Sequence, residues 1–391
     1  MTRALIVAAK RTAIGKLSGQ FASLNAMDLG GVAIAAALAQ AKVDPASVDA
    51  VLMGQVLQAG QGQITARQAA VKAGVPMTVH ATTINKVCLS GLQSLYLADL
   101  MVRAGEADAV IAGGMESMTQ APYLLPGARA GYRLGDQSVV DSMMYDGLYC
   151  AFDHCAMGLS TERHNAGAVS RARQDEFSAR SHQLAAAAQA AGRFDDEIVA
   201  VAVPQRRGDP LSITLDEGVR ADTTAESLAA LRPAFDPAGT VTAGNASQIS
   251  DGGAALIVVS EARANELGLE PLGELIAYGQ VAGPDASLLT QPSHAISKAA
   301  RRAGLDPAAL DLYEINEAFA AVGLASIDDL GLDEAKVNVN GGAVALGHPI
   351  GMSGARLAMT ALYELRRRGG GVAAVALCGG GGQGDAALLR V

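Results

Sequence analysis

The sequence predicts an α/β protein made of two similar halves with a more polar segment inserted between them. Half of the 391 residues are hydrophobic, 45 are glycine and none is tryptophan, which suits helices packed closely on sheets of small residues. Apolar runs such as "ADAVIAGG" and "VAAVALCGG" have the length and the bounding glycines of strands in a sheet that is covered on both faces.

An internal repeat predicts the two halves. Residues 41–56, "AKVDPASVDAVLMGQV", match residues 303–318, "AGLDPAALDLYEINEA", in an Asp-Pro helix start, a second Asp and a strand-like apolar run. Further on, residues 88–114 match residues 351–380 in Ser-Gly, an amphipathic helix, Arg-Gly, a buried strand and glycines. Two copies of one α/β unit explain both matches.

The segment between the halves is more polar. It contains "RARQDEFSARSHQLAAAAQAAGRF", a helical stretch that begins at Ser170, followed by charged loops rich in Asp, Arg, Pro and Thr. We predict that residues 1–118 and 248–270 form the N-terminal half, residues 119–247 an inserted loop domain and residues 271–391 the C-terminal half. The insert is a candidate ligand-binding flap.

Charge and hydropathy exclude several classes of protein. A net charge of −9 argues against a nucleic-acid or anionic membrane surface, since both require a basic footprint. The start, "MTRALIVAAKRTAIGK", has too short an apolar core for a signal peptide and predicts a first strand. Because no apolar run is long enough to cross a membrane, we expect a soluble, cytoplasmic protein. Its four cysteines have no zinc or disulfide spacing, so we expect free thiols and no metal.

Cys88 lies just before the predicted helix "LSGLQSLYLADLM". The unpaired N–H groups of a helix start stabilise a thiolate, so we expect a lowered thiol pKa and a possible nucleophile. Taken alone, Cys88 and Cys378 at its strand end fit a buried structural role better, because free cysteine is among the most buried residues.

His348 and Asn316 change that interpretation. His348 lies in "VNGGAVALGHPIGMSGAR", at the point of the second half that matches Cys88 in the first, and a Cys/His pair is an activated nucleophile. Asn316 and Glu317 interrupt an apolar strand-to-helix junction and need hydrogen-bond partners, as site residues or as a helix cap. The other histidines are predicted to be solvated: His80, His154, His164, His182 and His294.

The C-terminal "LCGGGGQGD" has the GxGxxG spacing of a dinucleotide-binding turn after a strand. Only seven residues follow Gly384, too few for the helix, strand and acidic residue that such a site requires, so NAD-dependent oxidation is a remote alternative. A turn whose N–H groups approach a ligand oxygen is the better interpretation.

Four motifs together, "NKVCLSG", "INEAFA", "NVNGGAVALGHPIGMSGAR" and "LCGGGGQG", resemble the thiolase family, in this order and over essentially the whole length. The resemblance implies two βαβαβαββ halves that form a layered α-β-α-β-α core with an inserted loop domain. It also implies an acetyl-CoA C-acetyltransferase, which makes acetoacetyl-CoA and CoA from two acetyl-CoA by a ping-pong Claisen condensation, and runs the reverse thiolysis.

Roles for individual residues follow from the resemblance. Cys88 matches the acylated nucleophile, His348 its activating base and Cys378 the acid/base for the α-proton. Asn316, through a water, matches one oxyanion hole with His348, and the N–H groups of Cys88 and Gly380 match the second. The chemistry agrees, because a thiolate accepts an acyl group from a thioester readily and an enolate needs preorganised donors. The implied substrate-binding positions are Leu148, Met157, Arg220, Ser227, Ala234, Phe235, Ala243, Ser247 and Phe319.

Two positions depart from the family pattern. Ala156 replaces a histidine on the pantetheine side, and Leu288 stands where methionine is common, so the range of acyl chain length is open. A broader 3-ketoacyl-CoA thiolase of fatty-acid β-oxidation is therefore the main alternative, and a non-catalytic acyl-CoA binding protein a remote one. The resemblance further implies a homotetramer or homodimer and no cofactor, with acetyl-CoA, acetoacetyl-CoA and CoA as the only ligands.

Overall fold

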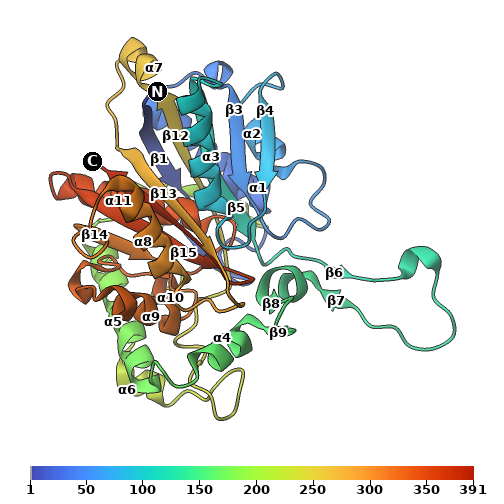
Figure 1. The fold of residues 1–391 in the computed structure, drawn as a ribbon. Helices are drawn as coiled ribbons and strands as arrows, with labels where there is room; N and C mark the ends of the chain where they lie inside the picture. Colours follow the sequence, from blue (N-terminus) through green and yellow to red (C-terminus); the bar gives the residue numbers. More distant parts are fainter. Residues whose placement is uncertain (1) are drawn as a thin grey trace.

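A computed structural model describes residues 2–391, and two mixed sheets enclose a central pair of helices in it (Figure 1). The N-terminal sheet has the strand order β1 (Ala4–Arg11), β12 (Ser250–Ser260), β5 (Ala109–Ser117), β3 (Ala50–Gly54) and β4 (His80–Ile84), and β2 (Gly15–Lys16) pairs with one end of β12. In this sheet β3 is parallel to β4 and β5, whereas β12 is antiparallel to β5 and β1.

The C-terminal sheet repeats this topology. Its strand order is β13 (Glu274–Ala282), β16 (Gln383–Arg390), β15 (Val372–Gly379) and β14 (Leu312–Ile315). Its one parallel pair, β14 with β15, corresponds to β3 with β5, and it is followed by antiparallel β16 and β13, as β5 is by β12 and β1. Both β1 and β13 also carry a bulge near their start, at Ile6/Ala8 and at Leu275/Ala277. The predicted duplication is confirmed for these four pairs of strands, whereas within residues 2–391 β4 has no counterpart in the second sheet.

Helices make up the remaining three layers. The central helices, α3 (Ser90–Ala104) and α11 (Ser353–Arg367), contact each other and both sheets. The outer face of the N-terminal sheet is covered by α1 (Ala26–Ala41), α2 (Thr65–Lys72) and α7 (Glu261–Leu267), and that of the C-terminal sheet by α8 (Gln291–Ala303) with α9 (Ala320–Leu330) packed on it. The predicted α-β-α-β-α core is thus confirmed.

Close backbone packing joins the halves around the carbonyl group of Gly351. A Cβ atom added at Gly54 would lie 2.6 Å from this oxygen, one at Gly91 would lie 2.9 Å from it, and one at Gly114 would overlap it. Only glycine permits such an approach, which explains part of the glycine content of the chain. Residues Ser353 to Leu365 of α11 are buried throughout, as expected for a helix enclosed between two sheets.

The segment between β5 and β12 forms three two-stranded sheets of its own: β6 (Tyr123–Leu124) with β7 (Val140–Asp141), β8 (Tyr149–Cys150) with β9 (Cys155–Ala156), and β10 (Val201–Val203) with β11 (Leu211–Ile213). Its helices are α4 (Met157–Asn165), α5 (Arg171–Ala190), which begins after Ser170 as expected, and α6 (Ala225–Ala229). The domain boundaries stay a prediction.

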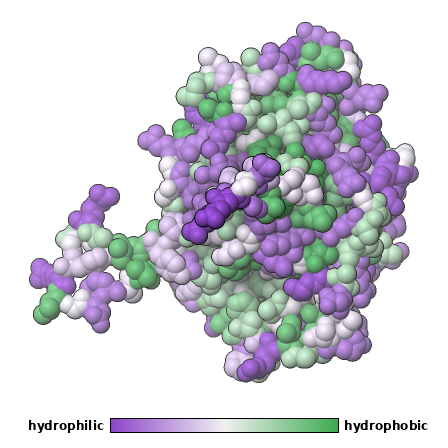
Figure 2. Space-filling view, turned by 180° about the vertical axis from the view of Figure 1, so that it is seen from behind, coloured by the Kyte–Doolittle hydropathy of each residue, from purple (hydrophilic) through white to green (hydrophobic). Residues whose placement is uncertain are grey.

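Residues 123–141 form an arm that reaches away from the body of the molecule (Figures 1 and 2). Apolar side chains lie exposed on it, including Leu125, Leu134 and Val139. Among residues 2–391, no helix has the length and apolar character needed to cross a bilayer.

Candidate active site

Four of the five predicted catalytic residues lie at or just after the ends of strands of the two sheets. Cys88 follows β4 at the start of α3, Asn316 follows β14, Cys378 is the last residue but one of β15, and Gly380 comes directly after that strand. His348 lies between the short helix α10 (Ala343–Leu346) and α11. The carboxyl ends of parallel strands meet at one edge of a sheet, so the duplicated topology brings both sets together.

One cavity of about 60 Å³ brings together half of the predicted site residues, while Asn316 and Cys378 do not line it. Cys88, His348 and Gly380 line it, together with four of the predicted substrate-binding residues, Leu148, Met157, Ser247 and Phe319. Leu288, the departure from the family pattern, is also in its wall and is buried. The other lining residues are Val87, Gly147, Ala318 and Ile350. The cavity is therefore a mainly apolar chamber with one thiol and one imidazole.

The hydrogen bonds of His348 fix its tautomer. Its Nδ1 lies 2.5 Å from Ser353 Oγ, and the Ser353 hydroxyl donates to the carbonyl oxygen of Pro349 at 2.9 Å. Because the hydroxyl proton is used in that bond, Nδ1 carries the ring proton and Nε2 is left as an acceptor. Burial, together with the nearby Arg356 cation, lowers the pKa of His348 to about 3. The free protein thus holds a neutral imidazole with its basic nitrogen available.

Asn316 faces this basic nitrogen. Its Nδ2 lies 3.4 Å from His348 Nε2, and the side chain is fully buried. Its Oδ1 is buried with no hydrogen-bond partner within residues 2–391. A buried amide oxygen without a partner is costly, so this atom is suited to hold a water or a ligand hydrogen.

Cys88 lies in a strained loop that is tied down on both sides. Val87 has a positive φ of 51°, a rare conformation for a β-branched residue. Asn85 Oδ1 accepts the Val87 N–H at 3.0 Å, and Ser90 Oγ accepts the Lys86 N–H at 2.8 Å. These bonds hold the loop in a form that exposes Cys88 partly to the cavity.

The expected lowering of the Cys88 pKa is wrong for the free protein. Burial raises the pKa of this thiol to about 12, and the charge of Glu116 adds to the rise, while a local backbone N–H opposes it. Because the thiol lies in an apolar chamber, its desolvation raises the pKa more than the N–H groups of the helix start lower it. Burial likewise raises the pKa of Cys378, and the neighbouring Cys88 adds to that rise. Both thiols are protonated at neutral pH, so a base has to act during the reaction.

The predicted CoA-binding residues separate into two places. Arg220, Ser227 and Ala243 line an open pocket of about 410 Å³ near α6. Phe235 lines neither this pocket nor the chamber, but it lies edge-on to Phe319 of the chamber wall, with ring centroids 6.4 Å apart. Ala234 is exposed and lines none of the described pockets, although its N–H is held by the Val241 carbonyl at 2.9 Å.

Arg220 rests on His182. The Arg220 main-chain N–H donates to His182 Nδ1 at 3.2 Å, and its guanidinium lies 3.0 Å from Nε2 of the same ring. His182 is fully buried, so the prediction that it is solvated is wrong. Burial and the Arg220 cation lower its pKa to about 4, which keeps this ring neutral.

Comparison with known proteins assigns the family. Residues 4–262 match the family model of the thiolase N-terminal domain, and residues 269–391 match that of the thiolase C-terminal domain. The chain belongs to the thiolase family. It is 58% identical to a Mycolicibacterium smegmatis protein named "Probable acetyl-CoA acetyltransferase", over 99% of this chain and 100% of the relative. It is 50% identical to the acetyl-CoA acetyltransferase of Cupriavidus necator, over the full length of both chains.

A solved structure is similar over the whole fold. The crystal structure of the Bacillus anthracis acetyl-CoA acetyltransferase superposes with a TM-score of 0.97 at 39% identity, covering 100% of this thiolase and 99% of that chain. The similarity thus extends through both halves and the segment between them.

Two features of this thiolase were not predicted from the sequence. The first is the role of Ser353 in fixing the tautomer of His348, because the sequence shows this residue only as part of the repeated Ser-Gly pair. Lys86 forms an ion pair with the buried Asp385 at 2.7 Å, and Asp385 also accepts from Tyr278 at 2.9 Å. Asp385 lies in β16 opposite Leu377, the neighbour of Cys378 in β15, so the pair ties the Cys88 loop to the strand that adjoins the second thiol's strand. No local pattern predicts a contact between residues so far apart.

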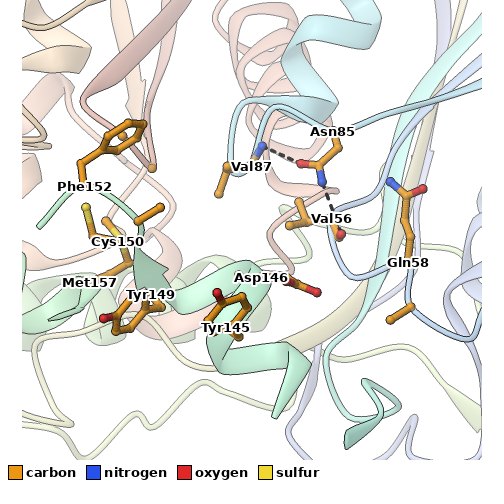
Figure 3. Close-up of a pocket in the computed structure, with 15 residues that line it drawn as sticks. Val56, Gln58, Asn85, Val87, Tyr145, Asp146, Tyr149, Cys150, Phe152 and Met157 are labelled. Carbon is orange, nitrogen blue, oxygen red and sulfur yellow. Dashed lines mark hydrogen bonds between the residues drawn. The ribbon is translucent and has the colours of Figure 1, made fainter. Parts of the chain in front are cut away.

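A second, larger cavity of about 560 Å³ adjoins the chamber (Figure 3). The two share Val87, Gly147, Met157 and Gly380 in their walls. The rest of its lining comes from the segment after β3, from the loop before Cys88, from the segment around β8 and from Gly381, and includes Val56, Asn85, Tyr149, Cys150 and Phe152. The two cavities therefore meet at the four shared residues.

Proposed function

We propose that this thiolase is an acetyl-CoA C-acetyltransferase, which condenses two acetyl-CoA molecules to acetoacetyl-CoA and CoA and catalyses the reverse thiolysis. The observation that carries the proposal is the pairing, in one apolar chamber, of the Cys88 thiol with a neutral His348 whose Nε2 is free to accept a proton. The names of the full-length relatives support the same activity.

In the first half-reaction His348 Nε2 removes the proton of Cys88 as the sulfur attacks the acetyl-CoA carbonyl. The S–C bond to Cys88 forms, and the bond to the CoA sulfur breaks. The leaving CoA thiolate takes the proton of Cys378. The products are acetyl-Cys88, CoA, a cationic His348 and a Cys378 thiolate. The first step needs the base because the Cys88 thiol, with a pKa raised to about 12, does not ionise alone.

In the second half-reaction the Cys378 thiolate removes an α-proton from a second acetyl-CoA. The enolate attacks the acetyl group on Cys88, a C–C bond forms, and Cys88 leaves and regains its proton from His348. The base of this step, the Cys378 thiolate, and the acyl donor, acetyl-Cys88, are both products of the first half-reaction. The proposed order of the two half-reactions follows from that dependence.

Donors around the chamber suit the two oxyanions. A water held by the unpaired Oδ1 of Asn316, together with His348, is proposed to stabilise the enolate oxygen. The N–H groups of Cys88 and Gly380, both in the wall of the chamber, are proposed to stabilise the thioester oxygen of the acyl-enzyme. Apolar side chains around these groups exclude bulk water and strengthen each contact.

The outer pocket suits the nucleotide end of CoA. Arg220 supplies a cation for a phosphate, and Ser227 and Ala243 line the same space. From there the pantetheine arm is proposed to run past Ala234, Phe235 and Ser247 to the chamber. This reaction chemistry uses only the residues of the chain and CoA thioesters, so we propose that no further cofactor takes part.

The small chamber favours a short acyl group. Leu148, Met157, Leu288 and Phe319 leave a volume of only about 60 Å³ beside Cys88. The competing function, a broader 3-ketoacyl-CoA thiolase, requires these side chains to move aside. Thiolysis of acetoacetyl-CoA and of 3-ketooctanoyl-CoA distinguishes the two. We expect a much higher kcat/KM for acetoacetyl-CoA, and equal or faster thiolysis of the longer substrate would contradict acetyl specificity.

We also propose that this thiolase forms a homotetramer or homodimer and that it is located in the cytoplasm. The exposed apolar side chains Leu125, Leu134 and Val139 on the arm support self-association, since such residues rarely face water without a partner. The four free cysteines support a reducing compartment. A solution mass and fractionation of the native cell test these two points.

A further inference from the structure

Two cysteines outside the proposed mechanism lie directly opposite each other. β8 and β9 are antiparallel neighbours, and their register pairs Cys150 with Cys155. Both side chains are buried, and both sulfurs are free thiols. Neither Cys88 nor Cys378, the two reacting cysteines, belongs to this strand pair.

The backbone already meets the main requirement for a disulfide between them. Directly opposite residues of antiparallel strands have Cα atoms about 4.5 to 5.5 Å apart. That interval lies inside the range of about 4.4 to 6.8 Å found for disulfides, so no strand has to shift. The four-residue turn between the two cysteines is closed by the Asp153 N–H, which donates to Cys150 Sγ at 3.3 Å.

The two sulfurs have different surroundings: Cys150 lines a cavity, and Cys155 lies beside a cation. Cys150 lies beside Phe152 and Met157 in the wall of the 560 Å³ cavity, where a small oxidant can reach it (Figure 3). Arg163 Nη1 lies 3.5 Å from Cys155 Sγ and stabilises its thiolate. Burial and the carboxylate of Asp153 outweigh this effect, so the pKa of the Cys155 thiol is raised above its usual value.

We propose that Cys150 and Cys155 form a reversible redox site, which a peroxide converts to a cross-strand disulfide. The Cys150 sulfur attacks one peroxide oxygen, the O–O bond breaks, and a sulfenic acid and water form. The Cys155 sulfur then attacks the Cys150 sulfur, an S–S bond forms and the S–O bond breaks, and the hydroxyl leaves with the proton of the Cys155 thiol as a second water. Two thiols are oxidised and one peroxide is reduced.

The disulfide links β8 to β9 covalently, and the residues that flank these two strands form part of one wall of the chamber. β8 follows directly after the π-helix Met143–Leu148, and β9 leads directly into α4, which begins at Met157. Leu148 and Met157 therefore flank the pair and line the chamber. The chamber of about 60 Å³ must widen to admit two acyl groups. Because a disulfide between β8 and β9 resists that widening, it lowers the rate of thiolysis. This last effect rests on the proposed function, whereas the disulfide does not.

Peptide mapping tests the disulfide without any use of activity. In the Cys88→Ser protein, treated with hydrogen peroxide and digested with trypsin, residues 134–163 form one peptide that holds both cysteines and no other. We expect this peptide to lose the mass of two hydrogens, to resist alkylation after denaturation and to recover with dithiothreitol. The Cys155→Ser variant in the same background supplies the control. Full alkylation of both cysteines after peroxide would overturn the proposal.

A rate measurement tests the effect on the chamber. Thiolysis of acetoacetyl-CoA is compared before and after peroxide in the otherwise native chain and in Cys155→Ser, so that oxidation of Cys88 affects both alike. We expect the native chain to lose several-fold more kcat/KM than the variant, with recovery by dithiothreitol. An equal loss in both, with the disulfide present in the native chain, would overturn the effect on the chamber and leave the function untouched. No thiolysis by either reduced protein would instead contradict the proposed function.

Discussion

The Nδ1 atom of His348 lies 2.5 Å from the hydroxyl oxygen of Ser353, which itself donates to the Pro349 carbonyl. This chain of two hydrogen bonds settles which ring nitrogen carries the proton. It leaves Nε2, the nitrogen next to Asn316, as the only base in the chamber. Ser353 acts through His348 and touches no substrate, so it is a positioning residue.

Replacement of Ser353 by alanine tests this relationship. Without the acceptor for Nδ1–H the imidazole can adopt the other tautomer, so we expect kcat/KM for thiolysis to fall by about tenfold to a hundredfold, part of the contribution typical of a general base. Ser326→Ala is the matched control, since Ser326 is a buried hydroxyl of α9 that donates to the Leu289 carbonyl. Threonine at 353 should restore part of the rate. A Ser353→Ala rate within twofold of the original would contradict the role.

The lowered pKa of His348 predicts how stability depends on pH. Unfolded histidine takes up a proton below about pH 6.5, whereas folded His348 stays neutral down to about 3. The stability that the neutral ring contributes is complete above pH 6.5 and is lost as the pH falls toward 3. The expected loss is about 1.4 kcal/mol per pH unit below 6.5.

Urea unfolding at several pH values between 7 and 4.5 measures this slope. His348→Asn should show a shallower loss of unfolding free energy than the original chain, because it removes the titrating group. His80→Asn serves as the control, since His80 is exposed. Identical slopes for His348→Asn and the original would show that His348 is not held neutral.

The ion pair of Lys86 and Asp385 predicts a coupled loss of stability and activity. Lys86→Met leaves the fully buried Asp385 carboxylate with the Tyr278 hydroxyl and no cation, so we expect a loss of about 3 kcal/mol in unfolding free energy. The acetylation rate of Cys88 should fall as well, because the loop loses its tie. Lys72→Met, which breaks an exposed pair with Asp28, should cost under about 1 kcal/mol. Equal costs for the two variants would refute the assignment.

The packing of Phe235 on Gly158 predicts an effect on binding. A Cβ atom at Gly158 would overlap the Phe235 ring, which lies edge-on to Phe319 at the chamber. Gly158→Ala should therefore raise KM for acetoacetyl-CoA about threefold to tenfold with a smaller change in kcat, as expected when ground-state binding is lost. In a Phe235→Ala background the same substitution should have no further effect. An undiminished effect there would show that the two residues are independent.

The fold and the reacting groups were predictable because they leave local signals. The glycine-bounded apolar runs predicted a duplicated α/β core, and they appear as matching strands β5 and β15 of the two sheets. The Asp-Pro helix start was predicted for both halves, but it forms a short 3-10 helix only at Pro45–Ser47, whereas Asp306 and Pro307 lie in a turn region. Cys88, His348, Asn316 and Gly380 stand at the ends of those elements, so their convergence followed from the duplication once the halves were recognised.

Other features depend on contacts that no local pattern encodes. The raised pKa of Cys88 reflects the apolar chamber, whose walls come from the segment around β8, from α9 and from the loop before α11. The burial of His182 reflects the packing of α5, and its polar sequence neighbours gave the opposite indication. Ser353, Lys86 and Asp385 likewise gain their roles only through residues distant in sequence.

The central claim is that Cys88 carries the acyl group after His348 has taken its proton. The most direct measurement is mass spectrometry of the protein quenched with acid after brief mixing with acetyl-CoA and digested with trypsin. The peptide of residues 87–103 contains Cys88 and no other cysteine, while Cys378 falls in residues 369–390. We predict one acetyl group on the first peptide, none on the second, and no acetylation in Cys88→Ser. Acetyl label that persists in Cys88→Ser, or that is found on Cys378 in the original chain, would contradict the account.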